Sequence, residues 1–198
     1  MDPDRPRHLG VVIADVSGKG ISAAILMAFL RPVLRSALDH TRDPVEALER
    51  TNHILVDERR TGLFVTVLCG ILDLDTGVFT FANAGHELPI LARADGSEPI
   101  RIAGGGPLLG VFGRLELSTQ SIEVRPGDWL ILYTDGIIDA AAPDGSRFGE
   151  PRLRDAILGT CVAAARETCR AVIQGVLDFQ ADADPADDLA LLVFRRLP

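Results

Sequence analysis

The middle of the chain constrains the fold most, because five apolar segments follow one another there with turn-forming Gly, Pro and Asp residues between them. These segments are rich in β-branched and aromatic residues, and they span residues 64–72, 78–83, 88–93, 115–124 and 129–133. Such composition predicts strands. Strands joined by short turns pair antiparallel, because a parallel pair needs a long crossover connection. The block therefore predicts antiparallel sheets.

Helical patterns lie on both sides of this block. A strand over residues 9–14, expected to be buried on both faces, precedes a helix from Ile21 that Pro32 should kink or end. Asp43 as N-cap, followed by Pro44, predicts the start of a second helix. Helical spacing returns in residues 149–179, and a last strand is expected at 189–194. This order predicts an α+β fold with two packed, mainly antiparallel sheets flanked by helices, in a single domain over residues 1–198.

Composition limits the class of protein. Of the 198 residues, 47% are hydrophobic and 24% are charged, as in a globular chain, and the net charge of −8 disfavours binding to nucleic acid. We expect a soluble, cytoplasmic protein without a membrane segment, because no apolar run approaches the roughly 20 residues of a membrane helix. The three cysteines form no C-x-x-C pair, so neither a disulfide framework nor a zinc knuckle is indicated.

Three acidic positions stand out because each adjoins an apolar strand: Asp15, Asp135 and the pair Asp187–Asp188. Neighbouring antiparallel strands bring the end of one beside the start of the next, so these acids could meet at one rim of a sheet. Crowded carboxylates then need protons or a cation, and an all-oxygen set suits Mg²⁺ or Mn²⁺. The alternative is that each Asp merely caps a strand or begins a turn.

Other motifs are weaker indications of a catalytic or binding site. Residues 15–22 include Lys19 in a Gly-rich turn before a helix, yet they do not form a Walker A motif. The helix start there could still orient an anionic phosphate. His86, which follows Asn83-Ala84-Gly85, could be a general acid or a structural residue. No G-x-S-x-G elbow is present, which disfavours a side-chain nucleophile.

Six segments in order, IADVSGKGISAAILMA, NAGHELPILAR, GGPLLGVF, LILYTDGIIDA, SRFGEPRL and DDLALLVFRR, resemble the SpoIIE-like (RsbU-type) branch of the metal-dependent type 2C (PPM) serine/threonine phosphatases. The resemblance extends over residues 9–196. It implies a β-sandwich with helices on both outer faces and two Mg²⁺ or Mn²⁺ ions at one end. It also implies hydrolysis of phosphoserine or phosphothreonine by a metal-activated water. The implied substrate is a phosphorylated STAS-domain protein, an anti-sigma-factor antagonist.

Site roles follow from the resemblance position by position. Asp15 would bridge both metals, with the Val16 carbonyl on one of them, while Asp135 and Asp187 would complete the other. Supporting positions are those in or beside the matching motifs: Lys19, Asn83, His86, Gly136 and Asp188.

The chain departs from the family pattern at its start, where members carry a strand with a G-G-D-x-x-D-like motif and a further acid. Residues 1–8 are interpreted as the turn leading into the strand at 9–14, with Asp2 and Asp4 as turn residues. The competing hypothesis is therefore a noncatalytic or degenerate phosphatase module that binds a phosphoprotein or regulatory partner. The sequence leaves a homodimer open.

Overall fold

The chain forms two compact units, each built on one antiparallel sheet. The computed structural model describes residues 7–57, 62–160, 164–181, 183 and 187–197, so Asp2, Asp4 and Cys161 lie outside the described residues. Unit 1 comprises Met1–His86 and Ala103–Glu123, and unit 2 comprises Glu87–Ile102 and Val124–Pro198. Each unit is described by itself.

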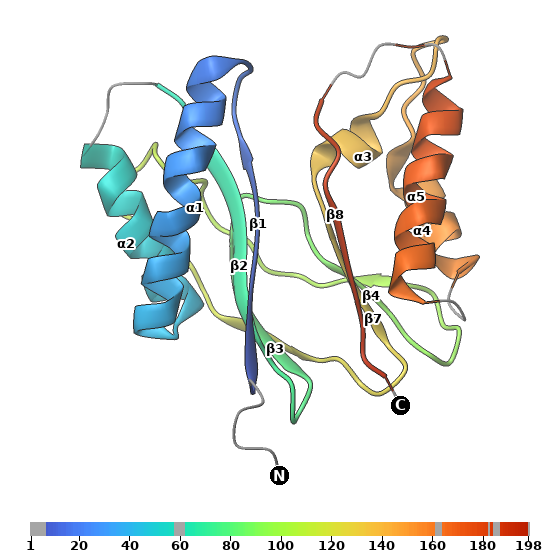
Figure 1. Cartoon of the computed structure of the whole chain (residues 1–198), viewed down its shortest axis with the longest axis horizontal. Coiled ribbons are helices and arrows are strands. Elements are labelled where there is room, and N and C mark those ends of the chain that lie inside the picture. The colour runs from blue at the N-terminus through green and yellow to red at the C-terminus, as the bar shows by residue number, and fades with distance from the viewer. Residues whose placement is uncertain (1–6, 58–61, 161–163, 182, 184–186, 198) are drawn as a thin grey trace. The chain divides into compact units, whose positions relative to one another are not determined.

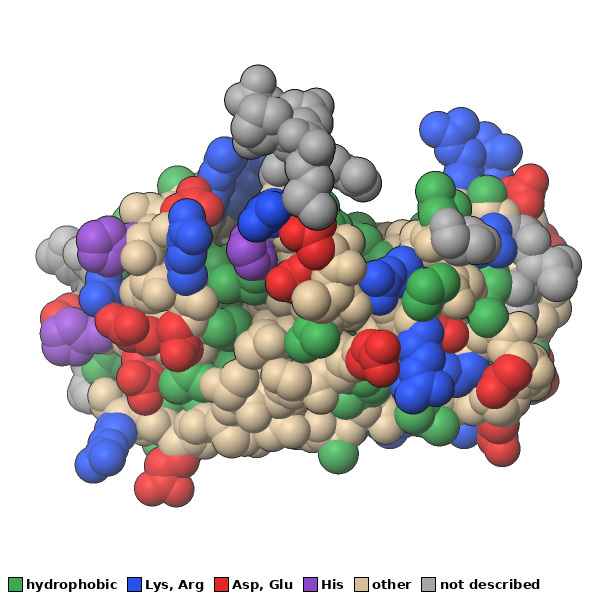
Figure 2. All heavy atoms as spheres, turned by 90° about the horizontal axis from the view of Figure 1, so that it is seen from below, with side chains coloured by type: hydrophobic (Ala, Val, Ile, Leu, Met, Phe, Trp, Pro, Cys, Tyr) green, Lys and Arg blue, Asp and Glu red, His purple; other side chains and the backbone are tan. Residues whose placement is uncertain are grey.

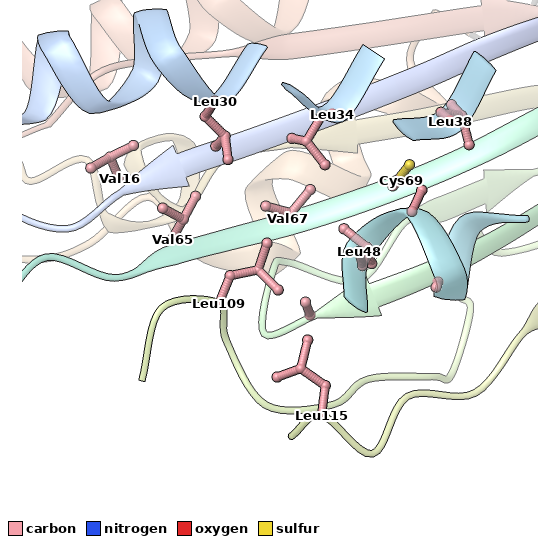
Figure 3. Close-up of a cluster of buried hydrophobic side chains, with 13 residues drawn as sticks. Val16, Leu30, Leu34, Leu38, Leu48, Val65, Val67, Cys69, Leu109 and Leu115 are labelled. Atoms are coloured by element: carbon pink, nitrogen blue, oxygen red, sulfur yellow. The ribbon is translucent and has the colours of Figure 1, made fainter. Parts of the chain in front are cut away.

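The described residues of unit 1 form a four-stranded sheet with two helices on one face (Figure 1). In sheet order its strands are β1 (His8–Val16), β2 (Val65–Asp73), β3 (Val78–Ala84) and β6 (Gln120–Glu123), and its helices are α1 (Ile21–Thr41) and α2 (Pro44–Asp57). Leucines of both helices point onto β2 in the core shown in Figure 3, among them Leu34 and Leu48, which meet Val67 and Cys69. Cys69 is fully buried in this core, and this burial raises the pKa of its thiol to about 12.

Strand β1 differs from its prediction in length and in burial. It continues through Asp15, which therefore lies within the strand rather than after it. It is also the edge strand of its sheet in the described part of the chain. Val11 and Ile13 are buried, whereas Leu9 and Val12 are 40% and 38% exposed. The prediction of burial on both faces was wrong because a short apolar run does not distinguish an edge strand from a central one.

Helix α1 continues through Pro32 to Thr41 instead of ending there. Leu30, Leu34 and Leu38, spaced four residues apart, are buried and hold the helix on the sheet on both sides of the proline. Its 21 residues, with a mean hydropathy of 1.6 over the most apolar window, are long and apolar enough to span a membrane by length and composition alone. The contacts of the three leucines identify it as the helix that covers sheet β1-β2-β3-β6.

The start of α2 confirms the predicted cap. Oδ1 of Asp43 accepts hydrogen bonds from the backbone N–H groups of Val45, at 2.8 Å, and Glu46, at 3.1 Å. These bonds satisfy two donors that the first helical turn would otherwise leave unpaired.

Asp43→Ala should therefore lower the free energy of unfolding by about 1 kcal/mol, which corresponds to roughly 2–4 °C in Tm. Urea denaturation followed by circular dichroism measures the change. Asp39→Ala is the matched control, because Asp39 forms an exposed ion pair with Arg35 and should change stability by less than about 0.5 kcal/mol. Equal effects of the two substitutions would contradict the cap.

The described residues of unit 2 form the second sheet and three helices. In sheet order its strands are β5 (Ile100–Arg101), β4 (Ile90–Ala92), β7 (Trp129–Tyr133) and β8 (Leu191–Arg195), and its helices are α3 (Asp135–Asp139), α4 (Gly149–Leu158) and α5 (Ala165–Gln180). The core of the unit joins Ile131 and Tyr133 of β7 to Ile137, Leu153 and Val172 of the helices. The fold class is confirmed as α+β with two antiparallel sheets and helices.

Acidic and basic side chains are intermixed on the face shown in Figure 2. The described residues of that face form no continuous basic field of the kind that binds a phosphate backbone.

Candidate functional site

In unit 2, the corner between β7 and α3 lies beside the segment that leads into β8. Asp135 is the first residue of α3. The preceding Thr134 joins the two segments: its N–H donates to the Ala190 carbonyl at 3.1 Å, and its hydroxyl donates to the Asp188 carbonyl at 3.2 Å. The Ala190 N–H in turn donates to the Thr134 hydroxyl at 3.0 Å. These bonds hold the backbones that carry Asp135 and Asp188 together.

Gly136 allows this close approach. A Cβ atom placed on Gly136 would lie 2.3 Å from the Asp188 carbonyl oxygen and 3.5 Å from Cβ of Asp187. Only a residue without a side chain fits at this distance, so the glycine of the T-D-G motif is a packing requirement of the corner.

The surroundings of the Asp135 carboxyl group offset its negative charge only in part. Burial, and next to it the negative charge of Asp187, raise the pKa of Asp135. Its Oδ1 is buried and has no hydrogen-bond partner in the described residues, whereas Oδ1 of Asp187 accepts a bond from the Asp188 N–H at 2.8 Å. Two neighbouring carboxylates with an unpartnered oxygen fit a hard divalent cation, because such ions bind oxygen ligands and remove the repulsion.

Glu87 is a further acid near this corner that the sequence analysis missed. Burial raises its pKa, Arg101 at 3.7 Å opposes that rise, and the charges of Asp135 and Asp139 add to it. Nothing in the sequence pattern pairs Glu87 with Asp135, because 48 residues separate them and the proximity follows from the pairing of β4 with β7.

In unit 1, the predicted residues gather at one end of the sheet. Asp15 is the direct cross-strand partner of Thr66, and Val16 after it is buried in the helix-facing core. Lys19 is exposed, between Gly18 and Gly20, whose φ angles of 86° and 84° suit glycine.

Asn83 and His86 are tied to each other just past β3. The Asn83 side-chain amide donates to the His86 carbonyl at 2.9 Å, and the His86 N–H donates to Asn83 Oδ1 at 2.8 Å. Nδ1 of His86 also lies 3.0 Å from the Thr66 hydroxyl. Thr66, which sequence reasoning treated only as a strand residue, therefore connects His86 to the strand position opposite Asp15.

The structure thus groups the predicted residues in two sets, one per unit. Asp135, Gly136, Asp187 and Asp188 come together in unit 2, while Asp15, Asn83 and His86 come together in unit 1. Within the described residues, no group of three or more His, Cys, Asp or Glu side chains is placed to hold a metal ion. The metal-binding roles of these residues remain predictions.

Comparisons with known proteins identify the family of the chain. The family model for "Stage II sporulation protein E (SpoIIE)" matches residues 5–197. The chain is 26% identical to "Phosphoserine phosphatase RsbU" of Bacillus subtilis, over 95% of this chain and 56% of that protein. It spans between a third and three fifths of the length of the curated relatives that it matches.

Two solved structures share the fold. The "SiaA-PP2C domain of Pseudomonas aeruginosa" aligns with a TM-score of 0.84 at 21% identity, over 97% of this chain and 76% of that one. The RsbU and RsbW domains of Rv1364c from Mycobacterium tuberculosis align with a TM-score of 0.78 at 29% identity, over 97% of this chain and 54% of that one. With the family model matching nearly every residue, the chain belongs to the SpoIIE family of PPM-type serine/threonine phosphatases.

Proposed function

We propose that this chain is a metal-dependent phosphatase that removes phosphate from phosphoserine or phosphothreonine in a STAS-domain anti-sigma-factor antagonist. The observation that carries the proposal is the pair of neighbouring carboxyl groups of Asp135 and Asp187, in which Oδ1 of Asp135 is buried without a hydrogen-bond partner in the described residues. Gly136 and the bonds of Thr134 hold the two segments that carry this pair together. The relatives RsbU and RsbP are both named phosphoserine phosphatases, which supports the same reaction and substrate class.

The oxygen ligands proposed for two divalent cations are the carboxylates of Asp15, Asp135 and Asp187 and the carbonyl of Val16. Bound cations would supply positive charge against the phosphate and a water of lowered pKa. Asp135 and Asp187 would bring two negative charges to one cation, and the backbone bonds of Thr134 would keep them at a fixed separation. One fold neighbour, RsbX, was crystallised "in complex with magnesium", which supports the choice of cation.

The proposal is tested with a phosphoserine STAS-domain protein as substrate. We expect phosphate release in Mn²⁺, a loss of at least about 100-fold after treatment with EDTA, and recovery when Mn²⁺ is restored. A phosphate-release assay follows the reaction, and a pull-down measures binding of the phosphoprotein. Release that EDTA leaves unchanged would refute the metal dependence, and binding without release would favour the noncatalytic module.

A further inference from the structure

Thr66 is related to two residues of the unit 1 set, Asp15 and His86. Asp15 and Thr66 are paired directly across β1 and β2, which puts their side chains on the same face of the sheet. The Thr66 hydroxyl also lies 3.0 Å from Nδ1 of His86. Val65 and Val67, the neighbours of Thr66 along β2, belong to the helix-facing core, so Thr66 and Asp15 occupy the opposite face.

His86 is itself fixed in place. Its backbone exchanges two hydrogen bonds with the Asn83 side chain, and the two residues are only 7% and 3% exposed. The connecting Gly85 has φ of 73°, and a Cβ there would lie 3.2 Å from Leu108, so this turn has little freedom to rearrange. The imidazole is therefore a rigid partner for the Thr66 hydroxyl.

A hydroxyl held by a rigid partner has a defined direction. Threonine offers one O–H donor and two acceptor lone pairs, and the His86 tautomer decides which of these Nδ1 uses. The hydroxyl keeps hydrogen-bonding capacity beyond its bond to Nδ1, and its direct cross-strand partner on the same face of the sheet is Asp15. Polar groups that orient a ligating carboxylate typically change metal affinity by about 10- to 100-fold when they are removed.

We infer that Thr66 is a positioning residue: with its hydroxyl oriented by His86, it fixes the Asp15 carboxylate for cation binding. The inference rests on the proposed function, since it assigns Thr66 a role toward the same cations. Positioning of the Asp15 carboxylate requires the hydroxyl of Thr66 and not merely the shape of its side chain. A valine at this position should therefore fill the same space but fail to position Asp15.

Calorimetric titration of the full chain with Mn²⁺ tests the inference. Thr66→Val should weaken Mn²⁺ binding by about 10- to 100-fold and lower kcat while KM for the phosphoprotein stays unchanged. Thr66→Ser keeps the hydroxyl and should bind Mn²⁺ within about 3-fold of the unchanged chain. The matched control is Thr80→Val, because the Thr80 hydroxyl also bonds a side chain of this sheet, Ser121 at 3.2 Å, and should leave Mn²⁺ affinity unchanged.

Two results would overturn the inference. If Thr66→Val binds Mn²⁺ as tightly as the unchanged chain, or if Thr66→Ser loses as much affinity as Thr66→Val, the hydroxyl does not position Asp15. Both results leave the proposed function intact so long as the unchanged chain binds Mn²⁺ and releases phosphate. An unchanged chain that does neither refutes the proposed function and the inference together.

Discussion

Asp135→Asn is expected to abolish phosphate release and, at the same time, to make the metal-free chain more stable. Loss of one carboxylate from a two-cation site removes charge that holds the cation, so we expect phosphate release to fall by at least about 1,000-fold, or about 4 kcal/mol in the activation barrier. Asp15→Asn, in the other unit, should reduce activity as strongly.

The gain in stability follows from the direction of the pKa shift. Burial and the charge of Asp187 raise the pKa of Asp135 above its ordinary value of 3.8, so the folded chain binds this proton more tightly than the unfolded chain. As pH rises through the window between 3.8 and the raised value, the free energy of unfolding falls, and above the window it stays lower. Asparagine carries no charge and removes this penalty. Because Asp135 is partly exposed, solvent screens the effect, and we expect a rise of only about 2 °C in Tm at neutral pH.

Calorimetric unfolding in EDTA, together with phosphate release in Mn²⁺, measures both effects on one preparation. Asp155→Asn is the control: Asp155 is an exposed aspartate on α4 of the same unit and should leave stability and activity unchanged. Normal phosphate release by the Asp135→Asn chain would contradict the proposed role of the Asp135 carboxylate in cation binding. Lower stability of this variant in EDTA would contradict the electrostatic account of the corner.

Local signals in the sequence were sufficient to predict those features that a short segment determines by itself. The start of α2 was predicted because Asp43 and Pro44 are a cap and a first helical residue whatever surrounds them. The turn between β2 and β3 is local in the same way, because Oδ1 of Asp73 accepts bonds from the N–H groups of Asp75 and Thr76, both at 2.9 Å. Asp135 and Asp187 were found because each adjoins an apolar strand.

Features that depend on pairing between distant segments could not be predicted in this way. The edge position of β1 and the place of Thr66 opposite Asp15 both follow from strand register, which no single segment encodes. Helix α3 has only five residues, too few for a helical period to appear in the sequence. Pro32 was expected to disturb α1, but the buried leucines on both sides of it override the local preference.

Gly136→Ala should disrupt the corner between β7 and α3, although alanine suits a helix better than glycine. Gly136 lies within α3, and its φ is not among the positive values that favour glycine, so intrinsic propensity alone would make alanine stabilising by about 1 kcal/mol. The obstacle is steric: the new Cβ would lie 2.3 Å from the Asp188 carbonyl oxygen. Because this atom belongs to the backbone, no side-chain rotation relieves the contact.

The segment before β8 must therefore move away from α3, and the bonds from Thr134 to Asp188 and Ala190 must lengthen or break. We expect a loss of about 2–3 kcal/mol in the free energy of unfolding, or roughly 5–10 °C in Tm. Displacement of Asp187 by about 1 Å relative to Asp135 should also lower phosphate release by about 100-fold in the fraction that remains folded.

Gly113→Ala separates this steric effect from the general effect of replacing a glycine. A Cβ at Gly113 meets no atom within 4 Å, so this variant should match the unchanged chain in Tm and in phosphate release. If the Gly136→Ala chain has the same Tm as the Gly113→Ala chain, the Asp188 carbonyl can move away from the new Cβ without a loss of stability. In that case the closeness of Asp187 to Asp135 could not be attributed to the glycine, and the placement of both carboxylates would depend on the Thr134 bonds alone.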